Sequence, residues 1–506
     1  MGALGGRVRD GAEKYIVDPE TAAARILDYS RNGVLTVGTS GFGSVGYPKT
    51  VPAPLARLAA ERGVRLNVLT GASAYGMDQV FAEHGVEARR YPYMNNPVLR
   101  RQIEEGRVAF MDYHLGEWPG MVENGFLDRV IGGLDVAIVE AALVGRDWYV
   151  PTGSVGAGPA WVEKARAVVV EVNTDIDTSI EGVHDIYRPR PGAPIPISRV
   201  DDRPGTPRAR IPPGKLIAVV ESRGIDHGGE PAEPGPVERR IAENLLEFLR
   251  GEVEEGRLPR SLYPLESGVG TVNDAVFKSL REAGFRGLRA WTEVVQDSLL
   301  GLYEEGVMEA MSCTSLMLTP KNLERFYSGA VSGRERIVLR PQDVTNNWEV
   351  IRRLRVIAVN TAVEVDIYGN VNSTHILGRR LINGIGGSGD YSRNAYLSIF
   401  IAPSTRKNGR ISSIVPMVSH VDTPDHDVDV IVTDQGVCDL RGLSPREKAQ
   451  LVIERCASPE YRGLLEKYYR RALERGGHMP HDLRLAYSFH IALEEKGDMR
   501  AAEELL

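Results

Sequence analysis

The residues best placed for chemistry lie around a single glutamate, Glu293. It follows the run 288–291, which predicts a strand, and it precedes a segment expected to be helical. In α/β proteins, residues at the carboxyl end of a parallel strand face the crevice that binds ligands. Glu293 is therefore a candidate catalytic carboxylate, although on its own it could equally complement the positive end of a helix dipole, a contribution of up to about 1 kcal/mol.

Two glycine-rich runs accompany this carboxylate. They are Glu-Ser-Gly-Val-Gly at residues 266–270 and Asn-Gly-Ile-Gly-Gly-Ser-Gly at residues 383–389. Such runs expose backbone N–H groups that can bind a phosphate, a carboxylate or an oxyanion. Because acyl transfer needs both a nucleophile and an oxyanion hole, two glycine runs with a carboxylate between them favour that chemistry.

Two other motifs are expected to carry no cofactor. Residues 41–46 match the dinucleotide pattern G-x-G-x-x-G, but Tyr47 and Pro48 follow, and the next helix is expected only near residue 52 or 54. The next strand also ends without a ribose-binding acid, so a substrate-side loop or a structural turn is favoured. The acidic and histidine cluster at 420–429 leads into an apolar strand that would separate its side chains, so no metal site is expected.

Composition narrows the class of protein. The chain has 506 residues, 42% apolar and 25% charged, with a formal net charge of −7, which argues against disorder and against a nucleic-acid partner. No stretch is apolar enough for a membrane span, and the N-terminus does not resemble a secretory signal. The three cysteines, Cys313, Cys438 and Cys456, show neither disulfide nor zinc-site spacing, which favours a reducing, cytoplasmic compartment.

The elements that must position these residues form two series. Short β-branched runs alternate with helical segments up to residue 173, which predicts a largely parallel α/β sheet. Proline-rich residues 189–213 predict an extended crossing segment, and a second series of strands is expected from residue 215. We therefore expect an N-terminal α/β domain at 1–214 and a C-terminal one at 215–506. The latter ends in helices that open on a capping box at Ser444, Pro445 and Glu447.

Longer motifs resemble one known family along most of the chain. They are 266–270, Trp-Thr-Glu-Val-Val-Gln-Asp at 291–297, Leu-Arg-Pro-Gln-Asp-Val-Thr-Asn at 339–346, and the runs 364–375, 383–390 and 416–422. Together with the loop at 40–49, they resemble the acetyl-CoA hydrolase/transferase group of class I coenzyme A transferases. The resemblance implies two CoA-transferase-type (NagB/RpiA-like) α/β domains with an active site between them.

The resemblance also implies roles for individual residues. Glu293 matches the nucleophile, which attacks an acyl-CoA thioester and then carries CoA as a glutamyl thioester. The backbone N–H groups of Val269 and Gly387 would form the oxyanion hole, and Asn346 would position the thioester or the attacking carboxylate. The residues expected to line the CoA site are Gly268, Gly270, Asn383, Gly387 and Lys407. CoA is then a substrate, and no metal or redox cofactor is implied.

Several alternatives stay open at this stage. The leading function is transfer of CoA between an acyl-CoA and a small carboxylate, with succinyl-CoA and acetate as the leading pair. Hydrolysis of an acyl-CoA is the nearest rival, and a non-catalytic acyl-CoA-binding protein is a second one. A homodimer is expected by analogy with the family. Asp434 stands where the family usually has a glutamate, and residues 221–236 match no motif, so a neutral surface loop is expected there.

Overall fold

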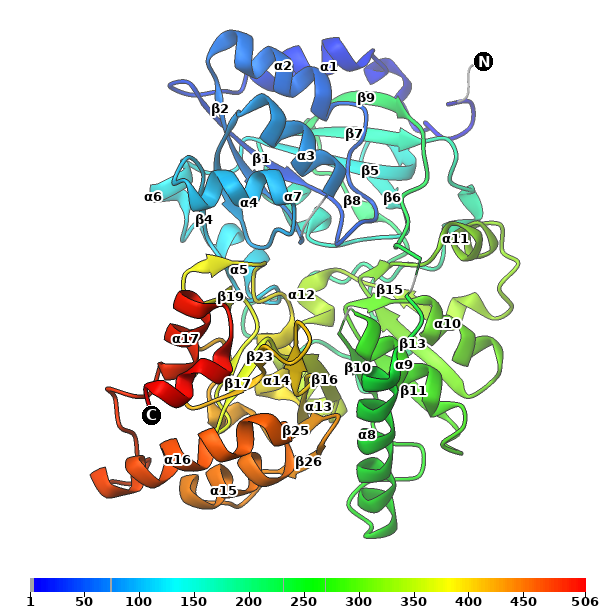
Figure 1. The fold of residues 1–506 in the computed structure, drawn as a ribbon. Helices are drawn as coiled ribbons and strands as arrows, with labels where there is room; N and C mark the ends of the chain where they lie inside the picture. Colours follow the sequence, from blue (N-terminus) through cyan, green and yellow to red (C-terminus); the bar gives the residue numbers. More distant parts are fainter. Residues whose placement is uncertain (1–3, 73–74, 231, 269) are drawn as a thin grey trace. The chain divides into compact units, whose positions relative to one another are not determined.

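The computed structural model describes residues 4–72, 75–230, 232–268 and 270–506 (Figure 1). The chain forms two compact units, each built from two separate stretches. Unit 1 comprises Met1–Glu230 and Ala290–Leu354, and unit 2 comprises Pro231–Arg289 and Arg355–Leu506. Both units are mixed α/β with parallel strands, which confirms the predicted fold class.

Unit 1 contains a nine-stranded sheet in the order β4-β3-β2-β1-β5-β6-β8, with β7 between β5 and β9. Its strands are parallel except at β6, which pairs antiparallel with β5 and β8. The strands are β1 Val34–Thr39, β2 Arg65–Leu69, β3 Glu87–Tyr91, β4 Ala109–Phe110, β5 Val136–Gly145, β6 Trp148–Pro151, β7 Ala167–Asn173, β8 Ala209–Arg210 and β9 Leu216–Ser222.

Helices cover both faces of this sheet. Val37 of β1 packs with α1, α2 and α3 in one core, while a side chain at Gly38 would meet Trp161 of α7, as the alternation of a strand requires. β5 and β7 are buried along their whole length, as is typical of central parallel strands. The helices are η1 Glu13–Tyr15, α1 Pro19–Leu27, α2 Pro52–Arg62, α3 Tyr75–His84, α4 Pro97–Glu104, α5 Trp118–Glu123, α6 Asp128–Ile131, α7 Gly158–Lys164 and η2 Thr178–Ile180.

One strand belongs to a different sheet from the one expected. Strand β9, which the sequence analysis placed at the start of the second series, pairs in parallel with β7 and completes the first sheet. The pairing joins strands that the proline-rich segment separates, and neither strand's own sequence reveals it. That segment forms only β8 and irregular backbone, as predicted. The division into domains at residue 215 itself stays a prediction.

The second stretch of unit 1 carries the residues around Glu293. Strands β11, β13 and β15 are neighbours in one sheet, and β12 and β14 form a separate parallel pair. The elements are β11 Leu288–Trp291, β12 Val294–Val295, α10 Asp297–Glu304, β13 Met308–Cys313, β14 Ser315–Leu316, α11 Pro320–Tyr327, η3 Arg334–Arg336, β15 Ile337–Leu339, α12 Gln342–Thr345 and α13 Trp348–Leu354.

Unit 2 is built on strands in the order β10-β16-β21-β25-β26, parallel except for the last pair. Its main elements are α8 Pro236–Glu254, β10 Leu265–Ser267, α9 Thr271–Leu280, β16 Ile357–Thr361, α14 Ser388–Asn394, β21 Leu397–Ile401, β25 Val430–Thr433 and β26 Gly436–Asp439. Short strands add small sheets: β17 Glu364–Asp366, β18 Val371–Asn372, β19 His375–Ile376, β20 Arg380–Leu381, β22 Thr405–Arg406, β23 Ile411–Ser412 and β24 Ile414–Val415.

The C-terminal end of unit 2 is helical, as predicted. The elements are η4 Asp425–Asp427, α15 Pro445–Arg455, α16 Pro459–Arg475, α17 Ser488–Lys496 and η5 Met499–Glu504. The capping box is confirmed, because the Glu447 carboxylate accepts hydrogen bonds from both the backbone N–H and the hydroxyl of Ser444. The helices bury one apolar cluster with β17, β25 and β26.

Candidate active site

Glu293 lies between β11 and β12, where main-chain contacts hold it. Its carbonyl oxygen accepts hydrogen bonds from the N–H groups of Thr314 and Ser315, at 2.8 and 3.1 Å. The helix expected to start at this junction begins only at Asp297, after β12. Because the effect of a helix dipole falls off within the first turn, the dipole-complementing role considered for Glu293 is wrong. Asp297 is the acid in that first turn.

Asn346 is brought directly to this carboxylate. Its side-chain amide nitrogen donates a hydrogen bond to Oε1 of Glu293 at 2.5 Å, and the asparagine side chain is fully buried. The Thr345 hydroxyl donates to Oδ1 of Asn346 at 2.9 Å, which fixes the way the amide faces. Thr345 is the last residue of α12, and Asn346 is its C-cap. The carbonyl oxygen of Thr345 accepts a hydrogen bond from the indole N–H of Trp291 at 2.7 Å. The Glu293–Asn346 pair is therefore held on both sides by α12 and β11.

The backbone of Gly116 packs closely against the backbone of Asn346 and helps to hold it in place. A Cβ atom added to Gly116 would lie 2.2 Å from the carbonyl oxygen of Asn346, so only glycine fits there. The loop that contains Gly116 also contacts α12, because the Gln342 side-chain amide donates to the carbonyl oxygen of Leu115 at 2.9 Å. The position of Asn346 thus depends on residues more than two hundred positions earlier in the chain.

Sequence reasoning missed the side chains that surround Glu293. The phenol of Tyr93 has its pKa raised to about 12, mainly by burial and then by the carboxylates of Glu293 and Asp112, so it stays neutral. Its ring packs against an apolar cluster of Phe42, Ala72, Leu115 and Val294, together with Met317. Tyr93 closely follows the carboxyl end of β3, and this place in a parallel sheet is the signal that could have identified it.

The other predicted site residues belong to unit 2, where they occupy separate loops. Gly268 and Gly270 flank Val269, which lies outside the described residues. Gly270 has φ +138° and precedes α9, whereas Gly387 precedes α14 with φ −85°. The predicted oxyanion hole therefore stays a prediction.

The two predicted CoA contacts differ in their surroundings. The Asn383 amide donates to the carbonyl oxygen of Gly384 at 2.7 Å, within its own glycine run. Lys407, with φ +50°, lies in the tight turn between β22 and β23. Their roles in binding CoA stay predictions.

Asp434 has a local structural role. Its carboxylate accepts hydrogen bonds from the backbone N–H and the hydroxyl of Ser404, at 2.5 and 3.0 Å, and from the amide of Gln435 at 2.7 Å. The shorter acid therefore orders the turn that follows β21.

The segment after β9 is not a neutral surface loop. Asp226 reaches back to an early loop of unit 1, where its carboxylate accepts the N–H of Gly46 at 3.0 Å and pairs with Lys49 at 2.7 Å. Lys49 also pairs with Glu140, and burial followed by the charge of Glu140 raises the pKa of Asp226 to about 7. The segment thus anchors the glycine loop 41–46, which carries Phe42. An isolated aspartate in an unmatched stretch gives no sequence signal for such a contact.

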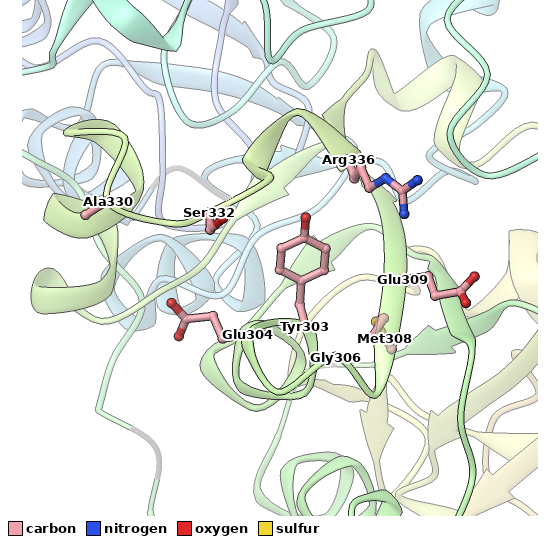
Figure 2. Close-up of a pocket in the computed structure, with 8 residues that line it drawn as sticks. All are labelled: Tyr303, Glu304, Gly306, Met308, Glu309, Ala330, Ser332 and Arg336. Atoms are coloured by element: carbon pink, nitrogen blue, oxygen red, sulfur yellow. The ribbon is translucent and has the colours of Figure 1, made fainter.

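Pockets lined by described residues include two in unit 1. One, of about 410 Å³, is lined by Asn346 itself, and its wall also includes Gly116, Arg190 and Trp348. The other, of about 470 Å³, lies between α10, β13 and the turn before β15, with Tyr303, Glu304 and Arg336 on its walls (Figure 2). The first pocket adjoins the candidate site through Asn346, whereas no predicted site residue lines the second.

The described residues form neither a metal-ligand cluster nor a membrane-spanning helix. In the described stretches 4–72, 75–230, 232–268 and 270–506, no three His, Cys, Asp or Glu side chains gather as a metal would require. In the acidic cluster, His420 pairs with Asp422 at 3.2 Å, and His426 pairs with Asp425. Among the helices of the described residues, none combines the length and apolarity needed to cross a bilayer.

The comparison with known protein families identifies the chain. Residues 14–205 match the acetyl-CoA hydrolase/transferase N-terminal domain, and residues 323–469 match the C-terminal domain of the same name. The chain belongs to the acetyl-CoA hydrolase/transferase family and is an enzyme of the CoA-transferase type.

Curated relatives carry two kinds of activity in their names. The chain is 42% identical to the succinyl-CoA:acetate CoA-transferase of Clostridium kluyveri, over 96% of this chain and 90% of that protein. It is 42% identical to the propanoyl-CoA:succinate CoA transferase of Escherichia coli, over 92% and 95%. It is also 42% identical to the acetyl-CoA hydrolase of Schizosaccharomyces pombe, over 98% of each protein.

Solved structures confirm the fold. RipA from Yersinia pestis superposes with a TM-score of 0.69 at 21% identity, covering 91% of this chain and 97% of its own. A 4-hydroxybutyrate CoA-transferase from Porphyromonas gingivalis gives a TM-score of 0.61 at 21% identity, covering 91% and 98%.

Proposed function

We propose that the protein moves CoA between an acyl-CoA and a small carboxylate, with succinyl-CoA and acetate as the leading pair, through a glutamyl-CoA thioester on Glu293. The observation that carries the proposal is the hydrogen bond from the buried Asn346 amide to Oε1 of Glu293. This bond fixes one oxygen and therefore the direction of the carboxylate, which is the positioning that covalent catalysis needs.

The proposed reaction has two halves. The Glu293 carboxylate attacks the thioester carbon, the C–S bond breaks, and a mixed anhydride and the CoA thiolate result. The thiolate then attacks the Glu293 carbonyl carbon, which releases the first carboxylate and leaves CoA on the glutamate. A second carboxylate repeats these steps in reverse and departs as the new acyl-CoA. No proton is taken from the nucleophile, because a carboxylate is ionised at neutral pH.

Unit 2 supplies the remaining groups in this proposal. The N–H groups of Val269 and Gly387 would stabilise the oxyanion, and Lys407 would contact CoA together with residues of the two glycine runs. The positive φ of Gly270 supports this assignment, because a conformation that favours glycine lets the backbone approach a ligand closely. We further propose that CoA is a substrate, that no resident metal or redox cofactor takes part, and that the enzyme acts as a cytoplasmic homodimer.

Hydrolysis is the second candidate, and the 42% identity to an acetyl-CoA hydrolase is the observation in its favour. In that reaction water, instead of a carboxylate, would resolve the intermediate. The apolar cluster around Phe42 and Val294 favours transfer, because an apolar wall beside the nucleophile limits the access of water. A non-catalytic acyl-CoA-binding protein would not need the Glu293–Asn346 hydrogen bond.

Trapping the covalent intermediate tests the proposal. The protein is incubated with succinyl-CoA or acetyl-CoA without an acceptor, treated with borohydride, and digested for mass spectrometry. We expect Glu293 to be reduced to its alcohol in the wild type and no such product in Glu293→Gln. An unreduced Glu293 in protein that demonstrably binds CoA would refute the thioester mechanism. Free CoA released without an acceptor, at the rate measured with one, would instead establish the hydrolase.

A further inference from the structure

Two of the three cysteines meet in the core of unit 2. Cys438 lies on β26 and Cys456 ends α15, and their Sγ atoms are 3.0 Å apart. Both side chains are completely buried. No pairing was expected from the sequence, because the cysteines show neither disulfide nor zinc-site spacing. Contact between β26 and α15 brings them together.

The two thiols lie in an apolar cluster and contact backbone carbonyl oxygens. The Cys438 thiol donates to the carbonyl oxygen of Leu451 at 3.2 Å, and Sγ of Cys456 lies 3.6 Å from the carbonyl oxygen of Ile431. The contact with Cys456 and burial both raise the pKa of the Cys438 thiol. A thiol of raised pKa is a poor nucleophile and a poor metal ligand, so neither catalysis nor metal binding explains the pair.

From this geometry we propose that Cys438 and Cys456 are a modification site, at which they form a disulfide bond within unit 2. A disulfide has an S–S length of about 2.05 Å, so the sulfur atoms need to approach by only about 1 Å. Two S–H bonds break and one S–S bond forms, and the two protons and two electrons pass to an external low-molecular-weight disulfide, which is reduced to two thiols.

The bond would have a local consequence. It would close a covalent ring from residue 438 to residue 456 that contains all of α15, the first helix of the C-terminal end. In the chain-entropy account, closing a ring of this size raises the ratio of folded to unfolded protein by about 200-fold. Because the site is buried, oxidised glutathione and small reductants alike would reach it only when unit 2 opens locally, so oxidation is expected to be slow.

The third cysteine provides an internal control. Cys313 is equally buried, but it belongs to unit 1, which contains no other cysteine. Protein incubated with oxidised glutathione is denatured in iodoacetamide without reductant, digested and analysed by mass spectrometry. We expect Cys313 to be alkylated, and the peptides of Cys438 and Cys456 to be joined and two hydrogens lighter than the separate peptides. After reduction, all three cysteines should be alkylated.

Variants separate the bond from a packing effect. The midpoint of thermal unfolding should fall on reduction in the wild type and in Cys313→Ser by the same amount. It should not respond to reductant in Cys438→Ser or Cys456→Ser, whatever their absolute stability. The proposal is overturned if Cys438 and Cys456 stay fully alkylatable after oxidation, because the pair is then a hydrogen-bonded dithiol. It is also overturned if each cysteine carries only glutathione, because no bond between the two has then formed. The outcome is independent of the proposed function, because the assay requires no activity.

Discussion

Replacing Asn346 by alanine should slow the covalent step without preventing CoA from binding. The variant removes one hydrogen bond between an amide and a carboxylate, that from Asn346 to Oε1 of Glu293. A hydrogen bond to a charged group contributes about 1.5–3 kcal/mol. At about 1.36 kcal/mol per factor of ten, kcat should fall by about 10- to 150-fold if this bond acts fully in the transition state.

The assay follows transfer of CoA from succinyl-CoA to acetate, with kcat and KM measured separately, and the rate at which borohydride-reducible Glu293 appears in a single turnover. Asn347→Ala is the matched control. The neighbouring Asn347 instead accepts hydrogen bonds from the N–H groups of Glu349 and Val350 at the start of α13. Its variant should lose stability but keep kcat.

A second substitution at the same position predicts the direction in which activity changes with pH. Asn346→Asp places a second carboxylate beside Glu293, and two such groups share a proton, which raises the pKa of one of them. Activity should then be weakest at low pH and recover as the pH rises. A folded Asn346→Ala enzyme with kcat within threefold of the wild type would refute the idea that Asn346 positions the nucleophile.

Three further substitutions test other parts of the structure. Phe42→Ala opens the apolar cluster beside Val294, so the ratio of acyl-CoA hydrolysis to CoA transfer to acetate should rise. An unchanged ratio would contradict the role of the cluster in excluding water. Burial raises the pKa of Glu87 from 4.5 to about 8, so the free energy of unfolding should fall as the pH rises from 4.5 to 8. Glu87→Gln should abolish that fall in urea titrations, and a persisting fall would argue against this assignment. Ser444→Ala removes half of the capping box and should lower the free energy of unfolding by about 1 kcal/mol with kcat unchanged; a lower kcat would show that the cap affects the site.

The sequence predicted the parts of the fold that depend on local patterns. The buried runs of β5 and β7 and the capping box at Ser444 follow from hydrophobicity and residue type within a few positions. The place of Glu293 after a strand made it a candidate, and the family resemblance gave it the role of nucleophile. The rest depends on contacts between distant residues. β9 pairs across the proline-rich segment, and Asp226 reaches back to Gly46 and Lys49.

The candidate site, too, depends on contacts between distant residues that local sequence patterns do not reveal. Asn346 was identified through a family resemblance, and its contact with Glu293 spans fifty-three positions that no periodicity links. Tyr93 was missed, because its role depends on burial next to a carboxylate two hundred residues later in the chain. Physical rules for strand ends could have suggested Tyr93, but they could not select it from the other residues at the same edge.

The discontinuous composition of unit 1 has a consequence for synthesis on the ribosome. Residues up to 230 form most of this unit, but Glu293 and Asn346 arrive with the later stretch Ala290–Leu354. At about 5–20 residues per second, the last of these residues is made about 6–25 s after residue 230. Until residue 293 is made, the nascent chain carries the first sheet and Tyr93 without the carboxylate. A growing chain therefore cannot complete the Glu293–Asn346 pair before the whole of unit 2's first stretch, Pro231–Arg289, has been made.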